Sequence, residues 1–82
     1  MSIEALGATL AGINEQLSDG YRVLHVAQQR LAEAGARLAE LSDNHSESLI
    51  PPQLALANDA LAVGMTQLAG SMAATERLAA GL

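Results

Sequence analysis

The feature that most constrains the fold is a hydrophobic repeat that runs from Ser2 to Leu41. One set of positions, seven residues apart, contains only isoleucine and leucine: Ile3, Leu10, Leu17, Leu24, Leu31 and Leu38. A second set, three residues further on, contains Leu6, Ile13, Gly20, Ala27, Ala34 and Leu41. None of these positions carries a charge or a polar side chain, and no proline interrupts the run. Spacing that alternates between three and four is typical of a long α-helix that buries a narrow seam against another helix.

The polar segment after this repeat predicts a loop at residues 43–51. Pro51 disfavours helical geometry at Ile50, whereas Pro52 suits the first turn of a new helix. A second and softer apolar stripe then follows, formed by Leu54, Leu61, Met65, Leu68, Met72, Leu78 and Leu82. The sequence therefore predicts an all-α fold with a single domain at 1–82, an antiparallel two-helix hairpin with helices at about 2–42 and 52–80.

Helix 2–42 has one weak point, at Gly20. Asp19 precedes it, and an Asp-Gly pair is also typical of a turn. Leu17 and Leu24 nevertheless keep the same phase of the repeat on either side of it. We therefore predict that this helix is continuous, with Ser2 as its N-cap.

The expected register of the hairpin leaves part of the first helix without a partner. Folding the chain about residues 47 and 48 places Leu54, Leu61 and Leu68 opposite three residues of the first helix: Leu41, Ala34 and Ala27. In this register the segment 3–10 overhangs the second helix. Two helices cannot enclose a core by themselves, whereas four can. We therefore expect self-association, most simply a homodimer that forms a four-helix bundle, or pairing with a similar helical hairpin.

The predicted interface combines residues of the first helix, from Ile3 to Leu24, with two flexible methionine side chains of the second helix. It consists of Ile3, Leu6, Leu10, Ile13, Leu17, Tyr21, Leu24, Met65 and Met72. Tyr21, Val23 and Val26 make the middle of the first helix apolar over a wide arc. This arc suits either the second interface of a four-helix bundle or a docking face for a different partner.

The charge balance excludes several classes of partner. The chain has a formal net charge of −5, with four arginines and no lysine, so no basic surface for nucleic acid can be assembled. No stretch reaches the roughly 20 apolar residues that a membrane helix needs. The first residues lack the basic region of a signal peptide. We expect a cytoplasmic protein, with secretion without a signal peptide as the alternative.

Side chains that carry chemistry are sparse. Cysteine is absent, and neither His25 nor His45 belongs to a His-x-x-x-His pair or to the Glu-x-x-His pattern of a di-iron bundle. His45 lies between Asp43 and Glu47, which could hold a weak adventitious metal, but an ordinary surface role is expected for both histidines. Glu33 and Arg37, four residues apart, read as a solvated ion pair. The sequence therefore predicts no enzyme activity, no cofactor, and no catalytic or metal-binding residues.

A short, acidic, cysteine-free chain of two long antiparallel helices resembles the helical hairpins of type VII secretion, the W-x-G family. This resemblance covers the whole chain as architecture. The family's Trp-x-Gly bend has no counterpart between Ser42 and Pro52, and its Tyr-x-x-x-Asp/Glu export signal is missing near the C-terminus. No functional residue is therefore carried over. The richness in alanine and leucine also resembles small helical proteins of high-GC bacteria.

Three functions follow as hypotheses. The first is a non-enzymatic structural or protein-interaction module that self-associates through the long seam. The second is a secretion-associated hairpin of the type VII kind, which would pair with a similar chain. The third is a small ligand or metal carrier with its site in the core of a helix bundle.

Overall fold

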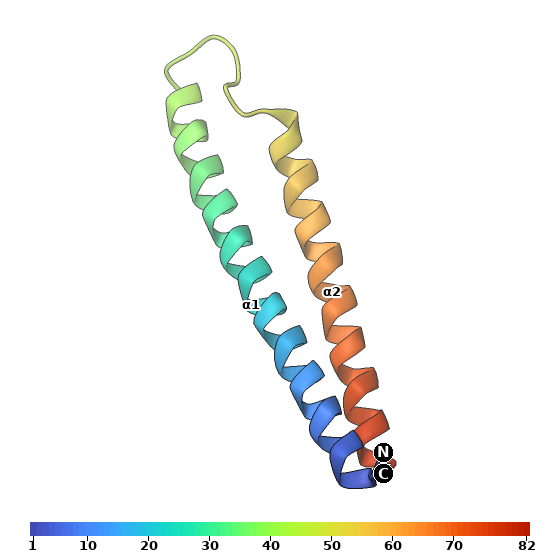
Figure 1. Ribbon diagram of the computed structural model, residues 1–82. Helices are drawn as coiled ribbons and strands as arrows, with labels where there is room; N and C mark the ends of the chain where they lie inside the picture. Colours follow the sequence, from blue (N-terminus) through green and yellow to red (C-terminus); the bar gives the residue numbers. More distant parts are fainter.

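The protein is a helical hairpin (Figure 1). The computed structural model describes all 82 residues. Helix α1 spans Ile3–Ser42 and helix α2 spans Pro52–Ala80, which confirms the predicted fold and its boundaries. The helices lie side by side and antiparallel, so both chain ends lie at one pole of the molecule and the connection lies at the other.

The hairpin is a rod. It measures 65 × 15 × 14 Å, and its radius of gyration is 19.0 Å. A compact globular chain of this length would have a radius of gyration of about 12 Å. The elongated shape means that each helix can bury only the side that faces its neighbour.

The ends of the helices form as the local sequence dictates. The Ser2 side chain accepts a hydrogen bond of 3.0 Å from the backbone N–H of Ala5, which satisfies one donor that the first turn leaves free. Helix α1 is continuous through Gly20, as predicted. Helix α2 begins at Pro52, where the missing N–H has no consequence for the first turn.

The connection is tied to the end of α1 by one side chain. Ser42 Oγ donates to the carbonyl of Leu38 and accepts from the backbone N–H of Leu49, both at 2.8 Å. Leu49 therefore lies beside the last turn of α1, and the chain folds back before α2 begins.

One half of the predicted seam is correct, and the other half is correct only near its centre. The leucine set is half-buried against α2, as predicted, at Leu10, Leu17, Leu24, Leu31 and Leu38. The second set at the seam lies four residues after these positions, not three, and comprises Gly7, Asn14, Tyr21, Gln28, Gly35 and Ser42. Of the set that was predicted to face α2, Leu6, Ile13, Ala34 and Leu41 are exposed, whereas Gly20 and Ala27 are half-buried.

The sizes of the side chains explain which side of the leucine row packs against α2. Both flanks of the leucine stripe have the same alternating spacing, so periodicity does not distinguish them. On the flank that is used, glycines accommodate leucines of α2. A Cβ atom built on Gly35 would lie 3.3 Å from Leu54 Cδ2, and one on Gly7 would lie 3.7 Å from Leu82 Cδ1. The predicted packing of large against small residues thus occurs, but with glycines in place of the alanines.

The register also differs from the prediction. Leu54 lies beside Gly35 and Leu68 beside Gly20, whereas the expected neighbours were Leu41 and Ala27. Helix α2 is therefore displaced by six or seven residues toward the N-terminus of α1, and the predicted overhang is shortened to the residues before Gly7. The physical cause is the connection. Non-helical residues advance the chain by up to about 3.3 Å each, against 1.5 Å in a helix, so the returning segment carries the start of α2 past the last turns of α1.

The hairpin has no hydrophobic core of its own. Thr75 is the one buried residue among the 82, and no hydrophobic side chain is buried. The chain exposes 5964 Å² to solvent. A compact monomer of this mass would expose about 4,600 Å². An area of roughly 1,300 Å² is thus available for burial by further association.

Candidate interaction surface

The seam between the helices divides the surface of the hairpin into two long flanks. One flank carries Tyr21, which lines two adjacent shallow hollows together with Met65 and Met72 of α2. Further along the same flank, Asn14 Nδ2 donates a hydrogen bond of 3.5 Å to a carboxylate oxygen of Glu76. This flank is therefore mixed in character, with polar groups among its apolar ones.

The opposite flank of α1 is uniformly apolar, and we call it the apolar flank. It consists of Leu6, Ile13, Gly20, Ala27, Ala34 and Leu41. Its large side chains are unprotected, since Ile13 is 41% exposed and Leu41 is 55% exposed. At the seam, Gly64 of α2 lies close to α1, since a Cβ atom built on it would lie 3.2 Å from Leu24 Cδ1. The small residues in its centre, Gly20 and Ala27, are half-buried, and Leu68 of α2 lies beside Gly20.

The arrangement of polar and apolar residues on α1 is the reverse of what an isolated hairpin needs. The flank packed on α2 includes Asn14 and Gln28, whereas four of the six residues of the apolar flank are exposed: Leu6, Ile13, Ala34 and Leu41. Two side-chain oxygens at the seam, Asn14 Oδ1 and Asn58 Oδ1, are buried and accept no hydrogen bond within the chain. A buried polar atom without a partner costs about 1–3 kcal/mol. Beside its leucine row, helix α1 thus places polar residues against α2 and leaves Leu6, Ile13 and Leu41 exposed.

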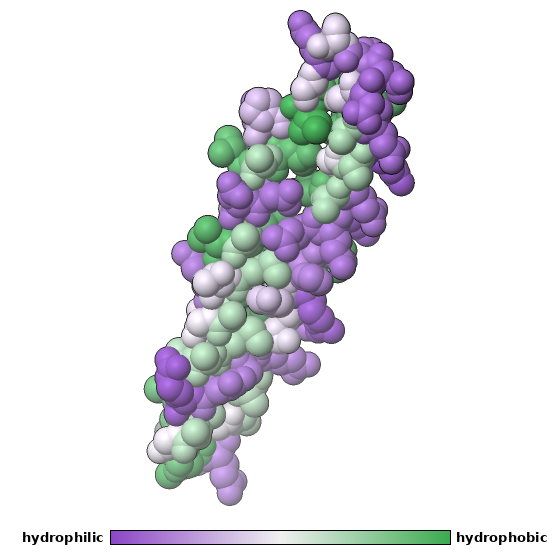
Figure 2. All heavy atoms as spheres, turned by 180° about the vertical axis from the view of Figure 1, so that it is seen from behind, coloured by the Kyte–Doolittle hydropathy of each residue, from purple (hydrophilic) through white to green (hydrophobic).

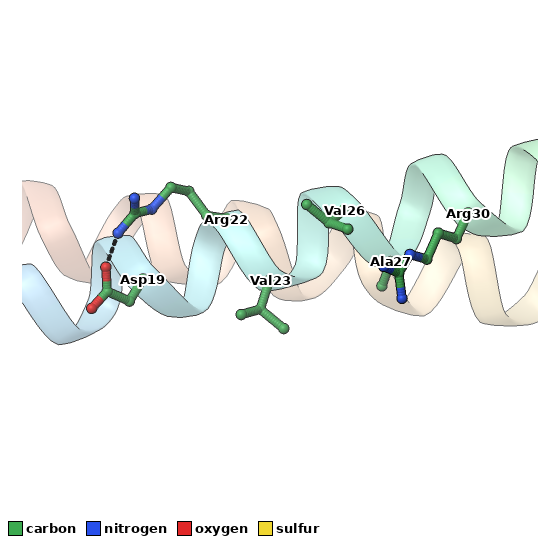
Figure 3. Close-up of a pocket in the computed structure, with 6 residues that line it drawn as sticks. All are labelled: Asp19, Arg22, Val23, Val26, Ala27 and Arg30. Atoms are coloured by element: carbon green, nitrogen blue, oxygen red, sulfur yellow. Dashed lines mark hydrogen bonds and ion pairs between the residues drawn. The ribbon is translucent and has the colours of Figure 1, made fainter.

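Two valines widen the apolar surface in the middle of α1. Val23 is 67% exposed and Val26 is 44% exposed. They line a shallow hollow together with Ala27 of the apolar flank (Figure 3). Asp19, Arg22 and Arg30 complete the lining of this hollow. The hollow is formed by α1 alone, on the side of the helix that α2 does not cover.

Hydrophobic groups reach the surface elsewhere as well. Figure 2 shows them along the length of the rod, alternating with hydrophilic patches. On α2, Leu56 and Val63 are exposed, and the stripe predicted from the sequence did not include them. They lie on α2 away from the seam that half-buries Leu54 and Leu61. Exposed hydrophobic side chains therefore occur on both helices.

The nine predicted interface residues fall into two groups. Six of them lie at the seam inside the hairpin and are half-buried there: Leu10, Leu17, Tyr21, Leu24, Met65 and Met72. Ile3, Leu6 and Ile13 are exposed and free to contact another molecule. Sequence reasoning did not assign Leu41 or Ala34 to the exposed surface. The polar character of Asn14 and Gln28 in the competing set could not have done so, because it favours exposure of that set and burial of Leu41 and Ala34.

Charged groups form few contacts. The ion pair of the structure joins Arg22 to Asp19, one turn apart on the exposed side of α1. The predicted pair between Glu33 and Arg37 is not formed. No three histidine, aspartate or glutamate side chains come together as a set that could hold a metal ion. Neither helix combines the length and the apolar character required to cross a membrane.

Comparisons of this chain with protein-family models, with curated proteins and with solved structures found no match. The hairpin architecture agrees with the general shape of the W-x-G proteins, and no family match supports membership. Functional inference therefore depends on the surface of the hairpin itself.

Proposed function

We propose that this protein is a non-enzymatic interaction module that self-associates, and that the apolar flank of α1 is the surface through which it does so. One observation carries the proposal. Helix α1 exposes the large side chains of its apolar flank, Leu6, Ile13 and Leu41, while it packs a row that contains Asn14 and Gln28 against α2. This arrangement is favourable only if a further surface covers the apolar flank.

The energies support this reading. Fully burying an exposed leucine or isoleucine side chain contributes about 1.5–3 kcal/mol. Leu6, Ile13 and Leu41 are 36%, 41% and 55% exposed, so completing their burial contributes roughly 2–4 kcal/mol per chain. The area of roughly 1,300 Å² that exceeds the surface of a compact monomer is comparable to the area buried by stable protein–protein contacts, about 800 Å² per partner. A second hairpin would complete a four-helix bundle and bury both copies of the flank.

The test is to place charge on the apolar flank and to measure mass in solution. We expect the wild-type chain to have twice the mass of one chain by light scattering. The double variant Ile13→Glu and Leu41→Glu should have the mass of one chain and remain helical by circular dichroism. Leu56→Glu with Val63→Glu is the matched control, since these exposed residues lie on α2. The control should still dimerise.

Two results would contradict the proposal. The first is a wild-type chain that is a well-folded monomer at micromolar concentration. The second is a dimer that survives both glutamates on the apolar flank but is lost in the control.

A second candidate is pairing with a different chain of similar shape, as in secretion-associated hairpins. The helical-hairpin architecture favours it, because a hairpin of matching length could cover the same flank. Co-expression with a hairpin encoded by a neighbouring gene would distinguish the two candidates. A heterodimer that forms at the expense of the homodimer would support the second candidate.

A further inference from the structure

The hollow in the middle of α1 has a symmetric layout of residues. Asp19, Val23, Val26 and Arg30 follow one another at spacings of four, three and four residues, which places them in one stripe along the helix. The two valines occupy the middle, a carboxylate lies at one end and a guanidinium lies at the other (Figure 3). The midpoint of the stripe falls between Leu24 and His25.

From this layout we infer that the hollow is the centre of a twofold contact between the α1 helices of two copies, which run antiparallel. The inference rests on the proposed self-association and specifies its geometry. A twofold axis perpendicular to α1 at the midpoint places Asp19 of each copy at the level of Arg30 of the other. The same axis places each Val23 at the level of Val26 of the other copy. The valines would thus pack around the axis, with an ion pair on either side.

The charges outside the hollow agree with the antiparallel orientation. The same axis places Glu33 at the level of Gln16 of the second copy, and Arg37 at the level of Gly12. No two like charges meet along this stripe. In a parallel arrangement Arg30, Glu33 and Arg37 would each face their own copy, and such contacts are destabilising. Charge pairs at the rim of an interface contribute mainly to orientation.

The groups required for these contacts are accessible. Arg30 forms no ion pair within its own chain and is exposed. Asp19 pairs with Arg22, also on the surface, so one carboxylate can contact both guanidinium groups. Ala27, which lines the hollow, belongs to the apolar flank, so the twofold contact is continuous with the surface proposed for self-association.

Cysteine cross-linking tests the orientation directly, because the chain has no cysteine of its own. The variants Gln16→Cys and Glu33→Cys leave the hollow intact. Mixed together under oxidising conditions, they should form a disulfide-linked heterodimer. Each variant alone should not cross-link, because its two cysteines would lie about 25 Å apart along the helix.

Charge exchange supplies an independent measurement. Asp19→Arg should weaken self-association at low salt by about threefold to tenfold, because it places arginine opposite Arg30 twice. The double variant Asp19→Arg with Arg30→Asp should restore the affinity, since it exchanges the two partners. Circular dichroism should show equal helicity in all these variants.

The outcomes separate this inference from the proposed function. Cross-linking of either cysteine variant alone would indicate parallel helices and would overturn the inference. A dimer by light scattering that yields no cross-link in the mixture would also overturn it, while the proposed self-association stands. A wild-type chain that is a monomer would overturn both.

Discussion

At the scale of single residues, the glycines of the helices differ in what surrounds them. A Cβ atom on Gly70 would meet nothing within 4 Å. A Cβ atom on Gly64 would lie 3.2 Å from Leu24 Cδ1, closer than side chains normally pack. The same residue type therefore weakens α2 at one position and allows the close approach of α1 at the other.

Replacing these glycines with alanine should have different effects. Gly70→Ala should raise the free energy of unfolding by about 0.5–1 kcal/mol, because alanine loses less backbone entropy in a helix. Gly64→Ala should raise the free energy of unfolding by a smaller amount or lower it, because Leu24 must move to admit the methyl group. Urea denaturation at one fixed protein concentration measures both variants. Equal stabilisation by the two changes would show that the seam near Gly64 is looser than described.

At the scale of the elements, the seam is a compromise between polar and apolar residues. Leu61 and Leu68 pack in the same row of α2 as Asn58, whose Oδ1 atom is buried without a hydrogen bond. Polar residues at seam positions lower stability and specify register, because any other register would bury them among apolar neighbours. Asn14 has a similar position on α1 and gains one contact, to Glu76.

Replacing Asn58 with leucine should therefore stabilise the hairpin. The variant removes a buried acceptor without a partner and adds apolar contacts, so we expect the free energy of unfolding to rise by about 1 kcal/mol or more. Asn44→Leu makes the same change in the exposed connection and should leave stability nearly unchanged. A loss of stability in Asn58→Leu alone would mean that this amide has a partner in the assembled protein.

The sequence predicts the two helices and their ends more completely than it predicts how the helices pack against each other. Ser2, Pro52 and the uninterrupted repeat predict both helices and their ends, because capping and periodicity are local properties. The flank of α1 that faces α2 was not predictable from spacing, because both flanks have the same period. The choice depends on how Gly35 and Gly7 receive leucines of α2, which is a property of the pair of helices.

The register was missed for a different reason. It depends on the path of residues 43–51, and in particular on the hydrogen bond from the Leu49 N–H to Ser42 Oγ that turns the chain back. Composition identifies this segment as a loop but does not give its direction. The exposed surface at Val23 and Val26 was recognisable from the sequence as a wide apolar arc. The position of this arc relative to α2 was not recognisable, because it depends on which flank of α1 packs against α2.

At the scale of the whole molecule, the absence of buried hydrophobic side chains is the dominant property. Single domains of this size derive most of their stability from apolar burial, and this hairpin has only half-buried contacts along one seam. Folding and association should therefore be coupled.

The helical signal should accordingly depend on protein concentration. In thermal melts followed by circular dichroism, dilution of the wild-type protein should lower the Tm, because assembly stabilises the folded state by mass action. The variant with Ile13→Glu and Leu41→Glu should melt at a lower temperature that dilution does not change. Superimposable wild-type curves at all concentrations would show that one hairpin is stable alone.

The position of the two chain ends determines where they would lie in an antiparallel pair of hairpins. Both ends of the hairpin lie at one pole of a rod that is 65 Å long (Figure 1). In an antiparallel pair, the ends of one copy lie beside the connection of the other, so each pole carries one set of chain ends. The two N-termini of such a dimer would lie at opposite poles, separated by a distance that the length of α1 sets. A distance measurement between labels attached to the two Met1 residues would report this separation.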